Sequence, residues 1–571
     1  MLVVSDRTPP SPSPDPAEFA QAIIDADDPL QLVVAGPGAG KTDLFKRLLT
    51  ARPGDNLAIT FINNLVDDLT EILEEIASVN TFHGYAKHLL HQFEGVGLSQ
   101  PFHYYPSSAE VFWQDTGWLL DRHVGKDDVA RAFHQMDDSN QVLSQYLRAA
   151  SYYNVVGHDD AVYRVVTHLD EHPEQVPSKN QVVVDEVQDF NALEMRLIEQ
   201  LAAKSRILAA GDDDEALYAF KHATPQYIRD LPANGYAVFE LPYCFRCTDV
   251  VIRSVHDVIE RATAAGLLTG RLPKRYWPNA AKAADSAAHP KIKAIMCSVD
   301  MAKAPYPALY VLEQVRAISA DDIKAASQGE YPTAMVIGRR HFIQRVDQEL
   351  RAHFPNNVSS PKPATSFTPL LDGYELLAKD GGSRLGWRLV TRGDPPANIA
   401  ATVREAITGE RDLQELLELA YRGGHLRHVA TVSALLGEQG VDGEALASLL
   451  AGLQMTEEEL KVALGLLPTP LPPNPDPNLP TITIASFMGA KGLSAAHVFI
   501  VGLVDGHFPQ NPMKITDTEV CEFIVALTRT RKQCHLVASR RYADQWVKPS
   551  EFFSWISKEC LEFIEVKKNH F

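Results

Sequence analysis

The sequence predicts an α/β protein with two parallel-sheet domains, each interrupted by a mostly helical insertion. The order of the elements leads to this prediction. Short apolar runs alternate with helical patterns over residues 17–95, as is typical of parallel strands joined by helices. Residues 96–177 have a mostly helical pattern, and strand-like runs return near residue 181. The second half of the chain repeats this order, so we predict that each helical stretch is an insertion.

The individual elements follow from the spacing of apolar residues. Predicted strands cover residues 32–35, 56–61, 181–185, 206–210, 333–337, 481–485 and 498–501, and predicted helices include 66–76, 413–421 and 457–466. At about 150 residues per domain, the 571-residue chain has room for roughly three or four domains. The predicted units are a Pro/Ser-rich, disordered lead-in (1–16), a first α/β domain (17–95 and 178–240) with its insertion (96–177), and a second α/β domain (241–361 and 480–571) with an insertion (362–479) that ends in a Pro-rich linker.

The composition is that of an ordinary soluble protein, with 45% hydrophobic and 22% charged residues. A net charge of −19 argues against a protein that coats nucleic acid without specificity, although it allows a local basic channel. We expect no signal peptide, and no transmembrane helix because no apolar run approaches about 18 residues. Six cysteines are few for this length and favour a reducing cytoplasm. Cys244 and Cys247 form a CxxC pair, but no second Cys/His pair stands nearby to complete a metal site.

A phosphate-binding loop is predicted at residues 31–45. An apolar run ending at Ala35 is followed by Gly-Pro-Gly-Ala-Gly, and Lys41-Thr42 then opens a helical pattern. Glycines let backbone N–H groups approach a phosphate, the lysine reaches the β- and γ-phosphates, and the threonine hydroxyl holds Mg²⁺. The loop departs from the strict pattern in one respect, because Ala35 stands where the first glycine is usual. ATP and Mg²⁺ are therefore the expected cofactors.

An Asp-Glu pair follows the next buried strand pattern, in Val182-Val-Val-Asp185-Glu186-Val-Gln188-Asp189. The valines place Asp185 at the carboxyl end of a strand, where it can bind Mg²⁺ directly or through water. Glu186 can then orient and deprotonate the attacking water. An acidic pair alone is weak evidence in a chain with 73 acidic residues, but its position after an apolar run strengthens the assignment.

Together with the loop, Asp-Glu-x-Gln-Asp resembles the UvrD/Rep/PcrA family of superfamily 1 DNA helicases. The resemblance implies two tandem RecA-like domains with a helical insertion in each, and it covers both α/β domains. The insertions match only in position and general character. The other matching motifs, in order, are Thr60-Phe61-x-Asn63, Thr81-Phe82-His83-Gly84, Gly211-Asp-Asp-Asp214, Leu217-Tyr218-x-Phe220-Lys221, Phe245-Arg246, Ala490-Lys-Gly492-Leu493 and Val525-Ala-Leu-Thr-Arg529.

The resemblance also implies the site residues. The implied catalytic residues are Lys41, Asp185, Glu186, Gln188, Arg246 and Arg529. The implied ATP-binding residues are Gln21, Gly36, Gly38, Gly40, Lys41, Thr42, Phe245, Arg246, Gly492 and Arg529, with Thr42 and Asp185 holding the metal. The implied DNA-binding residues are Phe61, Asn63, Thr81, His83, Tyr218, Phe220 and Lys221. Phe245 is expected to stack on adenine, and Arg246 and Arg529 to contact the γ-phosphate.

Several positions depart from the family pattern. Glu215 replaces a glutamine, and its carboxylate is unfavourable near a γ-phosphate. Met488 and Ser494 stand where the family has His and Glu, which puts sugar selectivity and DNA contact in doubt. Val520 and Cys521 replace arginines that are common before the last motif. The implied catalytic residues are all present, so we expect an active ATPase.

The expected function is an ATP-dependent DNA helicase that moves 3′→5′ on single-stranded DNA and unwinds duplex in repair, replication or defence. One alternative is a DNA-stimulated ATPase switch that partners a nuclease in an anti-phage defence complex. The short second insertion, the acidic composition and the changed DNA-contact motifs favour this alternative to some extent. A second alternative is an RNA-remodelling ATPase. The expected partners are single-stranded or duplex DNA and, in the first alternative, a nuclease; no membrane is expected.

Overall fold

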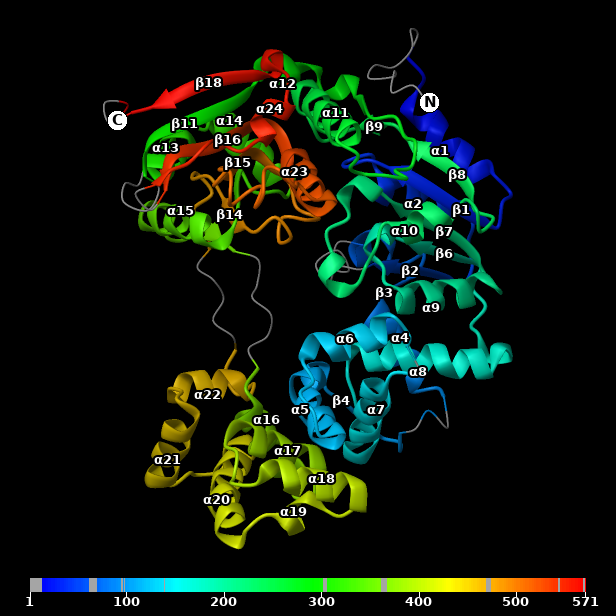
Figure 1. The fold of residues 1–571 in the computed structure, drawn as a ribbon, viewed down its shortest axis with the longest axis vertical. Helices are drawn as coiled ribbons and strands as arrows, with labels where there is room; N and C mark the ends of the chain where they lie inside the picture. The colour runs from blue at the N-terminus through cyan, green and yellow to red at the C-terminus, as the bar shows by residue number, and fades with distance from the viewer. Residues whose placement is uncertain are drawn as a thin grey trace.

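The structure is a computed structural model that describes residues 13–60, 69–93, 96, 98–137, 139–300, 306–360, 367–468, 474–542, 545–567 and 570. It contains two α/β cores that lie side by side, with two groups of helices together beneath them (Figure 1). The predicted α/β class with two parallel sheets is confirmed. Within the described ranges, no helix combines the length and the apolar character needed to cross a bilayer.

The first core is a six-stranded parallel sheet in the order β3-β2-β6-β7-β1-β8. Its strands are β1 Leu30–Ala35, β2 Asn56–Thr60, β3 Ser78–Thr81, β6 Gln181–Val184, β7 Arg206–Gly211 and β8 Ala237–Leu241. The inner strands are mostly apolar because helices cover both faces. One face packs on α1 Pro16–Asp25 and α2 Lys41–Ala51, and the other on α4 Phe82–Leu90 and α9 Ala192–Ala202. The short helix α10 Gln226–Asp230 precedes β8.

The first insertion contains α5 Ala109–Leu120, α6 Lys126–His134, α7 Gln141–Tyr153 and α8 His158–Glu171. It also has a small parallel sheet that the helical pattern did not predict, formed by β4 His103–Tyr104 and β5 Val155–Val156. The helix expected over residues 66–76 is described only in part, with residues 69–73 helical and residues 61–68 outside the described ranges.

The second core is an eight-stranded sheet in the order β13-β14-β12-β15-β16-β11-β18, with β17 antiparallel to β16. Its strands are β11 Ile292–Asp300, β12 Ala334–Ile337, β13 Val358–Ser359, β14 Ile482–Ala485, β15 Ala495–Val501, β16 Thr530–Tyr542, β17 Gln545–Trp546 and β18 Leu561–Val566. Its helices are α11 Asp249–Ala264, α12 Ala283–Ala288, α13 Tyr306–Arg316, α14 Ala320–Gln328, α15 Arg340–His353, α23 Asp517–Thr528 and α24 Phe552–Trp555. A two-stranded sheet of β9 Tyr243–Cys244 and β10 Trp277–Pro278 lies beside the first core.

The described part of the second insertion is helical. Its helices are α16 Pro369–Lys379, α17 Arg384–Gly393, α18 Ile399–Gly409, α19 Leu413–Leu416, α20 Leu419–Leu436, α21 Gly443–Leu453 and α22 Glu457–Ala463. The single helix expected over residues 413–421 is wrong. Leu417 and Glu418 have extended backbones, with ψ values of 144° and 141°, so the chain turns between α19 and α20.

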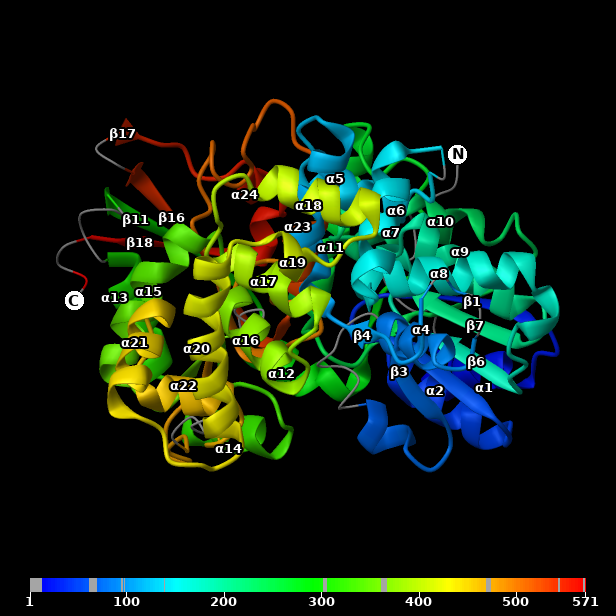
Figure 2. The same ribbon diagram turned by 90° about the horizontal axis from the view of Figure 1, so that it is seen from below.

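The two insertions are packed together through an apolar interface that surrounds a buried ion pair. Seen from below, α18 lies next to α5 (Figure 2). Arg388 on α17 donates from Nε to Asp115 on α5 at 2.9 Å, and both side chains are fully buried. Tyr153 donates a further hydrogen bond to Asp115 at 3.0 Å. Apolar residues of both insertions belong to one hydrophobic cluster that continues onto the first core, whereas the second core has its own cluster.

Asp115→Ala should strongly destabilise the packed insertions. Removal of the carboxylate leaves the Arg388 guanidinium buried without its counter-charge, which typically costs about 3–5 kcal/mol. Thermal unfolding should show the corresponding transition at a clearly lower temperature. Asp121→Ala is the control, because Asp121 pairs with Arg404 across the same interface but its side chain is 86% exposed. Equal effects of the two substitutions would show that the buried pair does not hold the insertions together.

Candidate functional site

The predicted phosphate loop joins β1 to α2. β1 ends at Ala35 and α2 begins at Lys41, after a turn in which Gly38 and Gly40 have φ values of +69° and +88°. Glycine adopts this left-handed region without steric cost. Gly40 makes no side-chain cap on α2, so the N–H groups of the first helical turn are available to bind an anion.

Residues at the start of the second core pack tightly against this loop. A Cβ atom on Gly36 would lie 2.7 Å from the ring of Tyr276, and one on Gly38 would lie 2.5 Å from the Cβ of Arg246. The Tyr276 hydroxyl also donates to the carbonyl of Pro37 at 3.0 Å. The loop glycines are therefore needed for close packing as well as for backbone conformation.

Gly36→Ala should lower thermal stability and weaken ATP binding. The added methyl group has to displace Tyr276, which is buried and held by its hydroxyl, and overpacking of this kind costs about 1–3 kcal/mol. Thermal unfolding and a nucleotide titration measure the two effects. Gly443→Ala is the matched control, because a Cβ at Gly443 meets no atom within 4 Å. A variant with unchanged stability and affinity would contradict the packing argument.

The acidic pair lies opposite Lys41, after the end of β6. Lys41 Nζ is 2.9 Å from Glu186 Oε1 and 3.5 Å from Asp185 Oδ1. Burial and the adjacent Glu186 carboxylate raise the pKa of Asp185 to about 6, although Lys41 opposes the shift. Burial acts in the same direction on Glu186, but Lys41 and Lys491 hold the pKa of that carboxyl below its usual range. Glu186 is therefore ionised at neutral pH, the state that can accept a proton.

Gln188 fixes the orientation of Glu186. Its side-chain amide donates to Glu186 Oε2 at 2.6 Å, and its carbonyl oxygen accepts from the backbone N–H of Asp212 at 3.1 Å. Glu186 itself has a φ of +58°, which is uncommon for a residue with a side chain. Strained backbone held by its surroundings is frequent where a side chain is aimed at a reacting group.

Basic residues of the second core reach this same place. Lys491 Nζ lies 3.4 Å from Glu186 Oε2 and is also paired with Asp189. Arg529 forms an ion pair with Glu215, and Arg246 donates to the carbonyl of Thr528 at 3.4 Å. The structure therefore brings Lys41 and Glu186 of one core together with cationic side chains of the other.

The chain is similar to known DNA helicases. Residues 125–234 match the family model described as the UvrD/REP helicase N-terminal domain. The ATP-dependent DNA helicase UvrD1 of Mycobacterium tuberculosis is 24% identical, over 98% of this chain and 88% of that protein. The ATP-dependent DNA helicase PcrA of Leuconostoc citreum is 23% identical over 95% and 85%, and that of Bacillus subtilis is 25% identical over 45% and 40%. The chain is UvrD/Rep/PcrA-like.

Two departures of this UvrD-like chain from the family pattern have partners in the structure. The charge of Glu215 is balanced by Arg529, and Thr528 Oγ1 donates to the same carboxylate oxygen at 3.3 Å. Ser494 accepts a hydrogen bond from Arg531 at 2.9 Å. The carboxylate at position 215 is therefore not an isolated negative charge beside the phosphate loop.

The acidic run Asp212–Asp214 is neutralised by residues that the sequence did not suggest. Its three carboxylates lie within 4.8 Å of one another, but Lys274 Nζ sits among them at 2.5–2.9 Å. Arg271 and Arg229 add ion pairs at 2.8 and 2.9 Å. An ammonium group thus already occupies the place that a cation would take, which argues against a metal site there.

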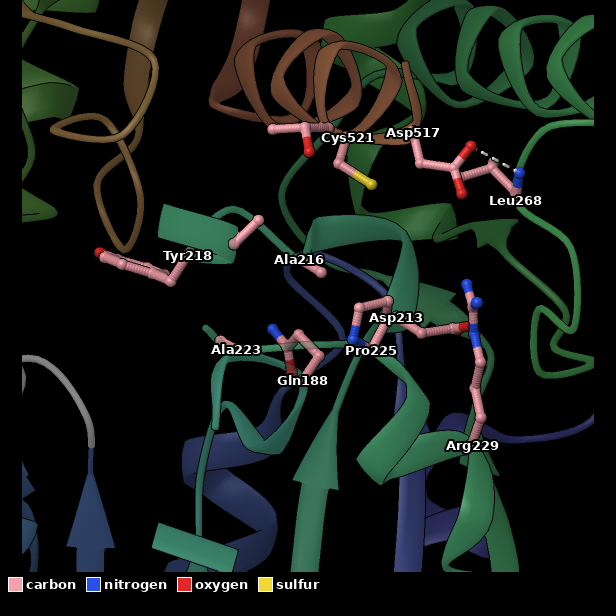
Figure 3. A pocket seen from close by; sticks show the side chains of 12 residues that line it. Gln188, Asp213, Ala216, Tyr218, Ala223, Pro225, Arg229, Leu268, Asp517 and Cys521 are labelled. Atoms are coloured by element: carbon pink, nitrogen blue, oxygen red, sulfur yellow. Dashed lines mark hydrogen bonds and ion pairs between the residues drawn. The ribbon is translucent and has the colours of Figure 1, made fainter. Parts of the chain in front are cut away.

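A hollow of about 50 Å³ lies next to this acidic run, between the first core and the start of α23 (Figure 3). Cys521 points into it from α23, and Asp213 and Gln188 line the opposite side. The cationic partners of Asp213, on the opposite side of this hollow, are Lys274 and Arg229.

The candidate DNA-contacting residues lie at the carboxyl edge of the first sheet. Thr81 caps α4 by accepting from the N–H of Gly84 at 3.0 Å, and His83 Nε2 lies 3.6 Å from Asp159 of the first insertion. The ammonium groups of Lys221 and Lys491 each lie 5.6 Å from the ring centre of Tyr218. Phe61, Asn63 and the side chain of Phe220 lie outside what the structure describes.

Of the remaining predicted nucleotide contacts, Phe245 and Gly492 lie near the ATP site and Gln21 does not. Phe245 lies beside Gly40 of the loop with 48% of its surface exposed, and Gly492 precedes Leu493, whose carbonyl accepts from Arg529 at 3.3 Å. Gln21 instead pairs with Asp25 and with Arg47, six residues along α2 from Lys41. The structure therefore does not bring Gln21 to the loop, because it faces the solvent side of α1 and α2.

Sequence reasoning missed three residues of this site. Lys491 lies within the motif Ala490-Lys-Gly492-Leu493, and its positive charge beside Gly492 is the sequence signal that indicates a role. Tyr276 and Lys274 carry no local signal, because their partners are residues of the first core that lie far away in the sequence. Their role is visible only in the three-dimensional structure, in which this segment packs against the first core.

Proposed function

We propose that this protein is an ATP-dependent DNA helicase that uses Mg²⁺, moves 3′→5′ on single-stranded DNA and unwinds duplex. The observation that supports this most strongly is the meeting of the phosphate loop with cationic residues of the second core. Lys491 contacts Glu186 across the boundary, and Arg529 and Arg246 lie beside it. An ATP site completed by two cores makes their relative position depend on nucleotide.

The residues of the first core fit the binding of a magnesium nucleotide. The N–H groups at the start of α2 and Lys41 would hold the phosphates. The Thr42 hydroxyl and the Asp185 carboxylate offer the hard oxygen ligands that Mg²⁺ prefers. Glu186, ionised and held by Gln188, would accept a proton from the attacking water. Bound Mg²⁺ would neutralise charge on the phosphates.

The residues of the second core would stabilise the charge that develops in the reaction. Arginines in this role typically accelerate hydrolysis by about 10³–10⁵. Arg529 has to exchange its Glu215 partner for a phosphate oxygen, so Glu215 would hold the arginine in place between turnovers. Loss of the γ-phosphate would return Arg529 to Glu215.

DNA contact is proposed along the carboxyl edge of the first sheet. The ammonium groups of Lys221 and Lys491 each lie 5.6 Å from the ring centre of Tyr218, so an aromatic ring and the charge of Lys221 are close to the ATP site. Stacking of a base on an aromatic ring contributes about 1–3 kcal/mol. Because Lys491 also pairs with Asp189 and Glu186, a change at the nucleotide can reach this surface through one side chain.

Repair, replication and defence against phage are all compatible pathways for this activity. The six cysteines are all free and buried, which supports the proposed cytoplasmic location. A protein partner such as a nuclease belongs to the alternative function, in which DNA-stimulated hydrolysis works as a switch.

Strand displacement tests the proposal. The purified protein is given ATP and Mg²⁺ with duplexes that carry a 3′ tail, a 5′ tail or no tail, and ATP hydrolysis is followed in parallel. Unwinding confined to the 3′-tailed duplex is the expected result. Hydrolysis stimulated by DNA without displacement would favour the switch function, and stronger stimulation by RNA would favour RNA remodelling.

A further inference from the structure

The CxxC pair of the sequence lies at the boundary between the two halves of the ATP site. Cys244 and Cys247 flank Phe245 and Arg246, and the backbone N–H of Phe245 donates to the carbonyl of Gly38 in the phosphate loop at 2.9 Å. The backbone N–H of Cys247 donates to the Cys244 sulfur at 3.2 Å, so the two cysteines face each other across one turn.

Each thiol is hydrogen-bonded to a different half of the site. Cys244 Sγ donates to the carbonyl of Pro37 in the phosphate loop at 3.2 Å. Cys247 Sγ donates to the carbonyl of Thr528, the residue before Arg529, at 3.4 Å. The Tyr276 hydroxyl lies 3.3 Å from Cys244 Sγ and 4.0 Å from Cys247 Sγ. The two S–H groups thus connect the loop of one core to the arginine of the other.

The two sulfurs differ in acidity, as is usual in reactive CxxC pairs. Burial raises the pKa of Cys244, but hydrogen bonds from Cys247 and Tyr276 outweigh it and lower the pKa to about 6. Burial raises the pKa of Cys247 well above its usual value. Burial likewise raises the pKa of the remaining cysteines, Cys297, Cys521, Cys534 and Cys560.

We propose that Cys244 and Cys247 are a peroxide-sensitive dithiol whose oxidation to a disulfide switches off the ATP site. The Cys244 thiolate attacks one oxygen of hydrogen peroxide, the O–O bond breaks, and the departing hydroxide takes up the proton that Cys244 lost. Cys247 then attacks the resulting sulfenic sulfur, the S–O bond breaks, and a second water leaves with the Cys247 proton. Two thiols and one peroxide give one disulfide and two waters, and a dithiol reductant reverses the reaction.

The disulfide removes the S–H donor of Cys247 to the carbonyl of Thr528 and closes a tight ring around Phe245 and Arg246. A disulfide also requires its own Cβ–S–S–Cβ torsion, so the turn that holds Arg246 against Gly38 has to shift. Misplacement of a catalytic group by about 1 Å can cost 10²-fold in rate. This functional consequence depends on the proposed ATPase activity, whereas formation of the disulfide does not.

Peptide mapping tests the bond itself. The full-length protein is treated with hydrogen peroxide, alkylated with iodoacetamide, denatured and digested with trypsin. Because cleavage follows Arg246, residues 230–246 and 247–253 leave as separate peptides unless Cys244 and Cys247 are joined. We expect a linked pair that disappears on reduction with dithiothreitol. Peroxide treatment that leaves both peptides separate would overturn the proposal.

ATP hydrolysis with DNA, measured on the same samples, tests the switch. Turnover should fall about 10²-fold on oxidation and return with dithiothreitol. In Cys247→Ser or, if that variant does not fold, Cys247→Ala, the ratio of oxidised to reduced turnover should stay near one. Cys560→Ser is the matched control and should respond like the wild type. A linked peptide pair with unchanged turnover would overturn the switch, and a reduced protein without any turnover would overturn the proposed function instead.

Discussion

Glu186→Gln should nearly abolish DNA-stimulated ATP hydrolysis while nucleotide binding is retained. The amide keeps the shape of the side chain and can still accept from Gln188, but it cannot take up a proton from water. Loss of a positioned general base typically costs about 10²–10⁴ in rate. Steady-state hydrolysis and a separate titration with nucleotide distinguish the two effects.

Glu199→Gln is the matched control for this substitution. Glu199 lies on α9 of the same core and pairs with Arg196 at an exposed position. Its hydrolysis rate should equal that of the wild type. If the Glu186→Gln variant and the Glu199→Gln variant both hydrolysed ATP at the wild-type rate, the assignment of Glu186 as the base would be wrong.

Arg529→Ala should reduce turnover by about 10³–10⁵, the range expected for an arginine that stabilises transition-state charge from another domain. Binding of ATP should fall much less, because Lys41 and the loop N–H groups remain. The side chain is 97% removed from solvent, and its loss leaves the Glu215 carboxylate without its counter-charge. The double variant Arg529→Ala with Glu215→Gln removes that unpaired charge and separates the effects on stability and on rate.

Arg540→Ala controls for the loss of an arginine from the same segment, since Arg540 lies on β16 with its side chain half exposed. Turnover should stay at the wild-type level. An equal loss of binding and turnover in Arg529→Ala, persisting in the double variant, would indicate a structural role for Arg529.

The parts of the fold and site that the sequence predicted are those encoded locally. The strand, glycine turn and helix around Lys41 are consecutive in the chain, so residue types alone define them. The same holds for the apolar run before Asp185. The cavity beside Cys521 and the pairing of Arg529 with Glu215 depend instead on tertiary contacts, for which a single sequence offers no local pattern.

The prediction of secondary structure from the sequence failed where a short element depends on residues that are distant in the sequence. β4 and β5 are two residues each and exist because Tyr104 and Val156 meet across the first insertion. The extended backbone at Leu417 and Glu418 interrupts a stretch whose apolar spacing is helical. The neutralisation of Asp212–Asp214 by Lys274 likewise needs the chain to return from α11 to the first core.

The packing of the two insertions has a mechanical consequence. The second insertion is covalently part of the second core, yet its apolar residues join the cluster of the first insertion and the first core. A hinge motion between the cores would therefore swing the second core against one larger rigid unit. Excision of residues 367–468 would therefore expose to water the apolar face of the first insertion that the second insertion covers. The second insertion thus stabilises the first insertion.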